Sequence, residues 1–296
     1  MFRTMVPSDL DSILTCLDTP SVNSTTRQRF VDYLKTGSYR PEWTWLALDG
    51  AQVAGLAVWW GFPAGDRPLA LDCLYAAPSV ADPVPMWTSL IRKVPPPVEY
   101  HIFVLPGERD NPEVSARLAA AAAAGLAKLT ERFRYDWTAD VPLPDRSTRL
   151  RFAADPDDEA FVEVFRRISE GSLDVATRSG IERIGARALA EEDVAHYKMM
   201  PGPRDRWRLA YDAGGELVGC ALPSANDGGP VVGYLGVVPE HRGHGYVDDL
   251  LAEITWLLAE TDATCIRADT DTTNAPMAAA FDRAGYRVFA IRLVAS

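Results

Sequence analysis

The sequence predicts a mixed α/β (α+β) protein made of two similar halves in tandem. The chain has 296 residues, long enough for two domains of about 150 residues each. In both halves, strand-like segments alternate with helical segments, and each half contains a strand–turn–strand pair. The stretch Pro142–Ser147 is the expected linker, so the predicted domains are residues 1–145 and 146–296.

The C-terminal half contains a full series of elements. A stripe of Phe161, Val164, Phe165 and Ile168 indicates the first helix, and Ala213-Gly-Gly215 is typical of a hairpin turn. The expected elements are strand Thr148–Ala153, helix Pro156–Ser169, a helical region over about Ile181–Met199, strands Arg206–Asp212, Glu216–Leu222 and Val231–Val238, helix 247–260, strand Cys265–Ala268, helix 275–284 and strand Arg287–Val294.

The N-terminal half repeats this outline. Its expected elements are strands Thr44–Leu48, Val53–Trp60, Leu69–Tyr75 and His101–Leu105, helix Pro112–Ala124 and strand Phe133–Thr138. After Pro78, however, the chain continues as Ser-Val-Ala-Asp-Pro-Val-Pro-Met, without glycine and with two prolines that have no N–H to donate. We therefore expect a degenerate half that is structural or forms one wall of an acceptor site.

Composition and charge exclude several classes of function. The formal net charge of −11 argues against nucleic acid or an anionic membrane as partner. Residues 149–296 carry 16 lysines and arginines against 24 aspartates and glutamates, which fits a cationic acceptor and equally fits simple solubility. The four cysteines are scattered, Asp269, Asp271 and Asp282 have no metal spacing, and no signal peptide or membrane span is recognisable. We expect a cytoplasmic protein without a metal.

The segment Arg242-Gly-His-Gly-Tyr-Val247 stands between a predicted strand and a predicted helix. Free N–H groups at a helix N-terminus, together with the helix dipole, make a site for an anion, and Gly243 and Gly245 let the backbone approach it. The segment therefore indicates a phosphate-binding loop. Two plainer explanations exist: Gly-x-Gly is often a plain connection, and Asn274 further on is also explained as an N-cap alone.

Two motifs in order resemble the GNAT acyltransferase superfamily. Arg242–Val247 is similar to its Q/R-x-x-G-x-G/A signature, and Asn274–Tyr286 is similar to its asparagine-started helix that ends in Gly-Phe/Tyr. The resemblance implies two tandem GNAT-like domains, each a twisted mixed sheet flanked by helices, with acetyl-CoA or another short acyl-CoA as co-substrate. It implies cofactor contacts from Leu235, Gly236, Val237, Arg242, Gly243, His244, Gly245, Tyr246, Val247 and Asn274.

The sequence departs from the family pattern at several positions. Val247 stands where Gly or Ala is usual, and Phe281 stands where many members carry a tyrosine that protonates the leaving thiolate. The fourth strand also lacks the carboxylate that often acts as base. Tyr234 and Glu170 are the candidate catalytic residues, and Glu170 and Asp174 the candidates for binding the acceptor. Tyr234 is alternatively a packing residue, and the two carboxylates are alternatively solvated loop residues.

The resemblance implies an N-acyltransferase that acts on an amine, which we expect to be a small molecule. The alternative is an acyl-CoA-binding pseudoenzyme that acts as a sensor or scaffold, which Phe281 and the missing carboxylate favour. We expect no nucleic-acid or membrane partner. The repeated outline favours a monomer with an internal pseudo-dimer, or a homodimer.

Overall fold

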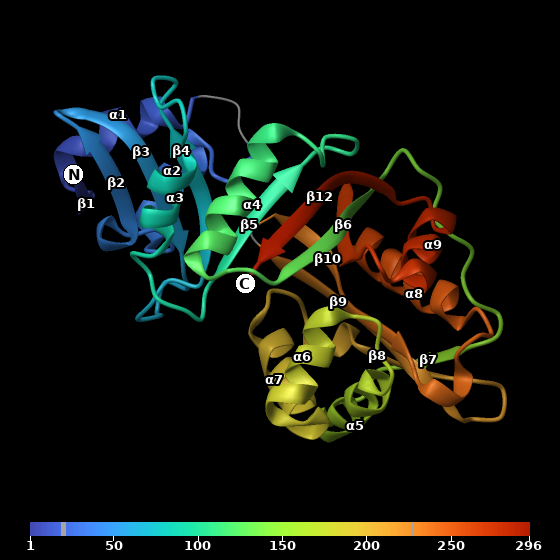
Figure 1. The fold of residues 1–296 in the computed structure, drawn as a ribbon. Coiled ribbons are helices and arrows are strands. Elements are labelled where there is room, and N and C mark those ends of the chain that lie inside the picture. Colours follow the sequence, from blue (N-terminus) through green and yellow to red (C-terminus); the bar gives the residue numbers. More distant parts are fainter. Residues whose placement is uncertain (19–21, 227) are drawn as a thin grey trace. The chain divides into compact units, whose positions relative to one another are not determined.

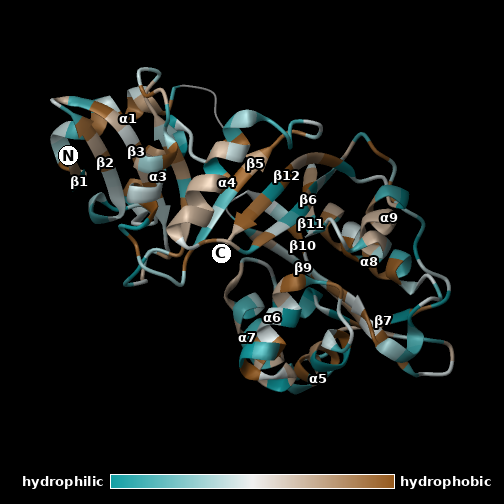
Figure 2. Ribbon diagram, viewed as in Figure 1, coloured by the Kyte–Doolittle hydropathy of each residue, from teal (hydrophilic) through white to brown (hydrophobic). Residues whose placement is uncertain are grey.

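The computed structural model describes residues 1–18, 22–226 and 228–296 and divides into two compact units. Unit 1 comprises Met1–Glu131 with Ala290–Ser296, and unit 2 comprises Arg132–Phe289 (Figure 1). Each unit is a mixed sheet with helices, as the sequence predicts. Apolar residues concentrate on the strands and on the helix faces that pack against them (Figure 2).

Unit 1 contains one sheet of mixed direction. Its strands, in sheet order, are β1 (Phe2–Thr4), β2 (Thr44–Asp49), β3 (Gln52–Trp60), β4 (Ala70–Ala76), β5 (Glu99–Val104) and the C-terminal part of β12 (Arg287–Ala295). Its helices are α1 (Leu10–Cys16), α2 (Arg27–Thr36), α3 (Val84–Ile91) and α4 (Pro112–Ala124), with single 3₁₀ turns at Pro7–Asp9 and Pro41–Trp43. All neighbouring strands for which the pairing is given run antiparallel except β4 and β5.

Helix α3 replaces the missing glycine loop of unit 1. It begins directly after Pro83, and Pro85 is its second residue. Proline is tolerated in the first turn of a helix because the N–H that it lacks has no intrahelical partner there. The two prolines that weaken this segment as a phosphate site therefore help to start a helix, which packs Trp87, Leu90 and Ile91 into the core.

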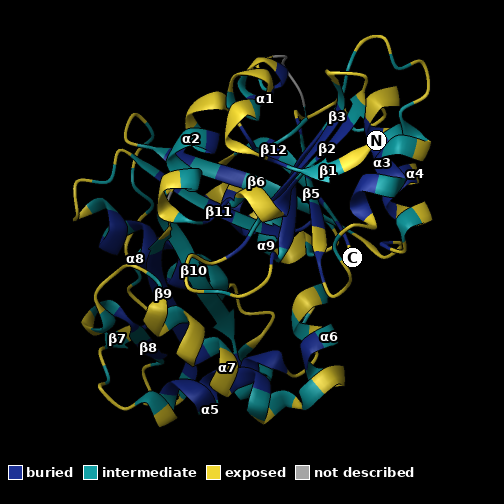
Figure 3. Ribbon diagram, turned by 90° about the vertical axis from the view of Figure 1, so that its left-hand side faces the viewer, coloured by how far each residue is buried: buried dark blue, intermediate teal, exposed yellow. Residues whose placement is uncertain are grey.

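Unit 2 also contains one mixed sheet. Its strands, in sheet order, are β6 (Leu129–Thr138), β11 (Cys265–Asp271), β10 (Gly229–Val237), β9 (Leu217–Asn226), β8 (Arg208–Tyr211) and β7 (Arg151–Ala153). Helices α5 (Asp158–Ser169), α6 (Val175–Ile184) and α7 (Ala186–Met199) lie on one face, and α8 (Tyr246–Ala259) and α9 (Ala275–Arg283) on the other (Figure 1). Single 3₁₀ turns occur at Arg204–Arg206 and Pro239–His241. A separate apolar core fills each face (Figure 3).

The last strand predicted for the N-terminal half, β6, lies in unit 2, and the last strand predicted for the C-terminal half, β12, ends in unit 1. β6 pairs with β11 from Arg132 to Thr138, whereas β12 pairs with β5 from Ile291 to Ala295. The units therefore divide at Arg132 and again at Ala290, and not at the expected linker after residue 145. Apolar alternation identifies a strand and its buried face, but it does not say which strand is its partner.

The expected helical region Ile181–Met199 consists of two helices, α6 and α7, and the first of them begins earlier than expected. Gly185, with φ of 83°, ends α6 and precedes α7. A positive φ is accessible to glycine and breaks the helical run. The break gives α7 its own direction and places Tyr197 near β10, where its hydroxyl donates a hydrogen bond to the Gly233 carbonyl.

Candidate functional site

Strands β10 and β11 separate almost as soon as they pair. Their parallel pairing has one registered pair, Val231 with Arg267, whereas β9 stays paired with β10 as far as Val237. Residues 232–237 of β10 therefore have a partner strand on one side only, and we call the other side the open edge. A strand edge carries unpaired N–H and C=O groups that can bind an extended ligand.

A bulge interrupts β10 at Gly233, where the register with β9 shifts. A Cβ atom added at Gly233 would lie 2.8 Å from the Leu222 carbonyl oxygen, so only glycine fits. Bulges re-aim the strand and its side chains. Here the bulge stands directly before Tyr234 and two residues before Leu235, where the predicted cofactor contacts of β10 begin.

The glycine loop lies between β10 and α8. Gly243 and Gly245 have φ of 80° and 74°, and a Cβ added at Gly243 would meet no atom within 4 Å. Among the described residues, none accepts a hydrogen bond from the backbone N–H groups of residues 243–247. The open approach, the free donors and the 14-residue helix behind them are what an anion requires.

Two acidic residues in the first turn of α8 would oppose an anion, but both are neutralised. Asp249 accepts a hydrogen bond from Arg149, and Asp248 pairs with Arg283 at 2.7 Å. Arg149 also donates to the carbonyl of His244 at 3.0 Å and lies 4.8 Å from the Tyr246 ring. Arg149 therefore places a positive charge at the surface of the loop, and sequence analysis did not identify it as a site residue.

Arg242 fixes the loop to its surroundings through three carbonyl groups. Its guanidinium donates to Val237 at 3.1 Å, and to Ile168 and Glu170 at 2.7 Å each. These bonds join the end of β10 to the C-terminus of α5. The Arg242 side chain is thus engaged within the protein and positions the loop, and its predicted cofactor contact stays a prediction.

Val247 does not crowd the loop. Its side chain packs against the apolar core beneath α8, on the face that also carries Leu250 and Leu251. The concern that Val247 closes the site is therefore not supported by its placement.

Phe281 and Asn274 have different surroundings. Phe281 is 1% exposed and stacks on Tyr135 with ring centroids 4.7 Å apart, so it is a core residue. Asn274 precedes α9 at the N-cap position, but its side chain makes no capping hydrogen bond. The carboxamide of Asn274 is half-buried and therefore remains available to a ligand, which argues against the explanation as a cap alone.

The predicted catalytic residues lie in contrasting environments. The Tyr234 ring stacks on Phe165 with centroids 4.0 Å apart, and burial raises the pKa of Tyr234 well above its ordinary value. Tyr234 therefore stays protonated and can only donate a proton or pack. The Glu170 side chain is 56% exposed and pairs with Arg166 at 2.9 Å along α5, which places it at the rim.

Asp174 belongs to a cluster that sequence reasoning missed, centred on Arg132. Asp174 also caps α6, accepting a hydrogen bond from the Thr177 N–H at 2.8 Å. The guanidinium of Arg132 makes ion pairs of 3.1, 2.9 and 2.9 Å with Asp174, Asp269 and Asp271. Arg132 thus ties the start of α6 to β11.

Another residue that sequence reasoning missed is Asp193 on α7. It is half-buried, and burial raises its pKa to about 6, with Glu192 and Asp174 adding repulsion. Burial raises the pKa of Tyr197 and that of Tyr234, and the charge of Asp193 adds to both shifts, so Asp193 lies within electrostatic range of both hydroxyl groups. Since Asp193 follows Ala190 by three residues and precedes Tyr197 by four, its place on the apolar side of the helix was the available signal.

Unit 1 has the same separation of strands, but its own chain fills it. β4 pairs with β5 only at Ala70 and Leu71. Beyond them, the Ser24 N–H donates to the Asp72 carbonyl at 3.1 Å, and the Phe103 N–H donates to the Val22 carbonyl at 3.0 Å. Residues 22–24 therefore occupy the space between β4 and β5.

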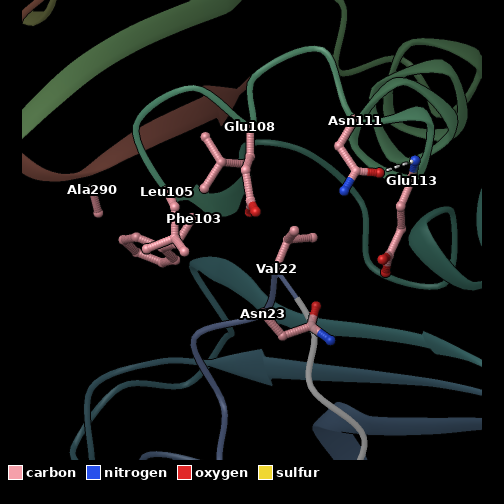
Figure 4. A pocket seen from close by; sticks show the side chains of 9 residues that line it. Val22, Asn23, Phe103, Leu105, Glu108, Asn111, Glu113 and Ala290 are labelled. Atoms are coloured by element: carbon pink, nitrogen blue, oxygen red, sulfur yellow. Dashed lines mark hydrogen bonds between the residues drawn. The ribbon is translucent and has the colours of Figure 1, made fainter.

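Side chains complete this filling of unit 1. Asn23 bonds both backbone groups of Leu74, accepting from its N–H at 2.9 Å, and Arg117 donates to the Leu74 carbonyl and the Tyr100 hydroxyl. What remains is a cavity of about 380 Å³ (Figure 4). Its lining is Val22, Asn23, Phe103, Val104, Leu105, Glu108, Asn111, Glu113 and Ala290.

Two further findings bear on the class of site. In the part of the chain that the structure describes, no group of three or more His, Cys, Asp or Glu side chains is arranged to hold a metal ion. Within the same residues, none of the helices has both the length and the apolar character that crossing a bilayer requires.

Comparisons with known proteins agree with this geometry. The profile of the Acetyltransferase (GNAT) family matches residues 182–286, which contain the open edge, the glycine loop and α9. A GCN5-related N-acetyltransferase from Sphaerobacter thermophilus superposes with a TM-score of 0.64 at 15% identity, over 99% of this chain and 94% of that one. A tandem GNAT protein from the clavulanic acid biosynthesis pathway gives 0.51 at 17% identity, over 100% and 98%.

An acetyltransferase of the GNAT family from Colwellia psychrerythraea gives a TM-score of 0.50 at 14% identity, with both chains covered completely. Identities this low show a shared fold and no more. No curated protein matches the sequence. The predicted resemblance is confirmed: the chain has the GNAT fold, and its residues 182–286 are a domain of the GNAT acetyltransferase family.

Proposed function

We propose that unit 2 transfers an acyl group from acetyl-CoA, or another short acyl-CoA, to a small-molecule amine. The observation that carries this proposal is the open edge of β10, which leads directly into the free N–H groups of residues 243–247. An extended ligand with a phosphate at one end fits that sequence of donors and acceptors.

The residues present fit the co-substrate. Gly243 and Gly245 admit a pyrophosphate to the N–H groups at the start of α8, with His244, Tyr246 and Val247 contributing backbone only. The open edge at Leu235, Gly236 and Val237 pairs with the pantetheine arm as an added strand would. A Cβ at Gly236 would lie 2.3 Å from Ile168, so the strand is held close to α5. The co-substrate supplies the activated acyl group as a thioester.

The chain's own residues then orient the reaction. The N–H of Val237 is proposed to donate to the acyl oxygen, which gains negative charge as the amine attacks. Tyr234 stands at the bulge with its proton retained, and it is proposed to donate to the leaving sulfur in place of a tyrosine at position 281. Glu170 at the rim and Asp174 beside Arg132 are proposed to attract a cationic acceptor.

The alternative is a binding protein that holds acyl-CoA without turnover. The observation in its favour is Phe281, which is buried against Tyr135 where many family members place a proton donor. Under either reading we propose that the protein acts in the cytoplasm as a monomer with an internal pseudo-dimer, or as a homodimer. The presence of amine-dependent release of free thiol separates the enzyme from the binding protein.

The proposal is tested by calorimetric titration of the protein with acetyl-CoA beside a Gly245→Trp variant. We expect micromolar binding that the variant loses, because the indole would occupy the anion site. Gly215→Trp is the matched control, since Gly215 also has a positive φ and open surroundings but lies in the β8–β9 turn. Equal binding by Gly245→Trp, or none by the unaltered protein, would overturn the assignment of the loop.

A further inference from the structure

Three successive acidic residues on α7 differ in their ion-pair partners. Glu191 pairs with Arg187 at 2.7 Å, and Glu192 pairs with Arg183 at 2.9 Å, in both cases at the exposed surface. Among the described residues, Asp193 has neither an ion pair nor a hydrogen-bond partner, although it is more buried than either. A half-buried carboxylate without a partner is costly, and such groups concentrate at functional sites.

The position of Asp193 relates it to the bulge in β10. One helical turn later on the same face, the Tyr197 hydroxyl donates to the Gly233 carbonyl at 2.8 Å. The Tyr197 ring also lies 6.1 Å from that of Tyr234, the residue after the bulge. Because residues four apart on a helix are neighbours, Asp193 lies on the same side of α7 as Tyr197, the residue that contacts β10 at the start of the open edge.

The other carboxylates on this side of the sheet are already satisfied. Asp174, Asp269 and Asp271 share the guanidinium of Arg132, and Asp271 also accepts from the Val175 N–H at 2.6 Å. Three aspartates therefore share one arginine, whereas Asp193 has no such partner among the described residues. A cationic ligand would complete the arrangement.

We propose that Asp193 is the catalytic residue that binds the ammonium group of the acceptor and takes its proton. The inference rests on the proposed function, because it needs an acyl donor on the open edge. In the step, R–NH₃⁺ gives one proton to the Asp193 carboxylate, and the nitrogen lone pair forms the new N–C bond. The C–S bond breaks with its electron pair on sulfur, the Tyr234 hydroxyl protonates that sulfur and is reprotonated by the second amine proton, and Asp193 later releases its proton to water.

The surroundings of Asp193 suit this role. Glu192 on its own helix and Asp174 at the N-cap of α6 repel its charge, Tyr197 and Tyr234 are neutral groups within range of that charge, and the guanidinium of Arg132 is paired with Asp174. With its pKa raised to about 6, the group is ionised at neutral pH and still a better proton acceptor than an ordinary aspartate. Turnover should therefore fall as the pH drops through about 6.

The first test compares Asp193→Asn with Glu191→Gln, which removes one charge from the solvent side of the same helix. The reaction is free-thiol release from acetyl-CoA with n-butylamine, phenethylamine or spermidine. We expect Asp193→Asn to lower kcat/KM by about 10²-fold at neutral pH and to lose the acidic limb of the pH profile. Asp193→Glu should restore part of the activity, and Glu191→Gln should change nothing.

A second test does not depend on turnover. In protein labelled with γ-¹³C aspartate and saturated with free coenzyme A, which has no acyl group to transfer, the Asp193 signal is identified as the one missing from Asp193→Asn. We expect one of the three amines to change the chemical shift of this signal and the pH midpoint of its titration. If none does, or if Asp193→Asn keeps both the unaltered kcat/KM and the acidic limb, the inference is overturned while the cofactor site stands. Failure of the unaltered protein to bind acetyl-CoA would instead overturn the proposed function.

Discussion

The two units share a fold but treat the same gap between parallel strands in opposite ways. In unit 1, β4 and β5 separate after Leu71, and residues 22–24 with Arg117 satisfy the exposed backbone. In unit 2, β10 and β11 separate after Val231, and the edge stays open. Unpaired backbone groups need a partner. Because unit 1 closes its strand edge and unit 2 leaves the same edge open, the comparison indicates that the edge of unit 2 is the one kept for a ligand.

The carboxylates of the two units differ in the same sense. Buried Asp72 in unit 1 accepts from Arg29 at 3.0 Å and from the Tyr39 hydroxyl at 2.8 Å. Asp193 in unit 2 has no such partners among the described residues. Asp72 is therefore held by partners within unit 1, whereas the carboxylate that we propose as the base of unit 2 is not.

The largest effect is expected from Arg117→Ala, which opens the filled gap of unit 1. Arg117 is 2% exposed, and its loss removes the donor to the Tyr100 hydroxyl and one of the donors to the Leu74 carbonyl. We expect the free energy of unfolding to fall by about 3–5 kcal/mol, measured by urea denaturation. Acetyl-CoA affinity of protein that remains folded should not change.

Arg109→Ala is the control, because Arg109 forms a half-exposed pair with Glu131 at 2.7 Å in the same unit and should cost less than about 1 kcal/mol. Equal losses in the two variants would show that the filling of unit 1 is not structural.

The next effect is a gain of stability in Asp193→Asn. A carboxylate whose pKa is raised to about 6 in the folded state stabilises the fold only when protonated, below its ordinary pKa near 4, and that contribution is lost as the pH rises through 6. We expect asparagine to raise the free energy of unfolding by about 1–3 kcal/mol at pH 8 and by almost nothing at pH 4.

Thermal unfolding at both pH values measures this difference. A loss of stability at pH 8 would mean that Asp193 is a structural residue with a partner, which would remove the contrast with Asp72.

The smallest effect is expected from Val247→Ala. Val247 packs on the core beneath α8 and contributes only its backbone to the loop. We expect a loss of about 1 kcal/mol in stability and an acetyl-CoA affinity within about twofold of the unaltered protein. A large gain in affinity would show that the valine does crowd the phosphate, as its departure from the family pattern suggested.

The glycine loop could be predicted because all of its signals are local. Gly243, Gly245 and the apolar run before them determine a strand, a turn and a helix start within about twenty residues. The exchange of β6 and β12 could not be predicted, since strand pairing depends on distant segments. Arg132 was therefore assigned to the wrong half and missed as a site residue.

Side-chain roles were harder to predict than backbone ones. Glu170 and Asp174 follow the first helix as expected, but Arg166 and Arg132 bind their carboxylates. Sequence analysis did not select Asp193 because it is the last of three consecutive acidic residues, a pattern typical of a solvent-exposed helix face. Only the break at Gly185, which requires a positive φ, gives α7 the direction that brings Tyr197 to β10, with Asp193 one turn before it on the helix.

The most direct test of the account is amide hydrogen exchange with and without acetyl-CoA. The two gaps predict opposite responses within one chain. We expect slower exchange at residues 232–237 and 243–247 when acetyl-CoA binds, and no change at residues 72–76 of β4. Protection at β4, or binding without protection of the glycine loop, would contradict the claim that unit 2 keeps its edge open for the co-substrate and unit 1 does not.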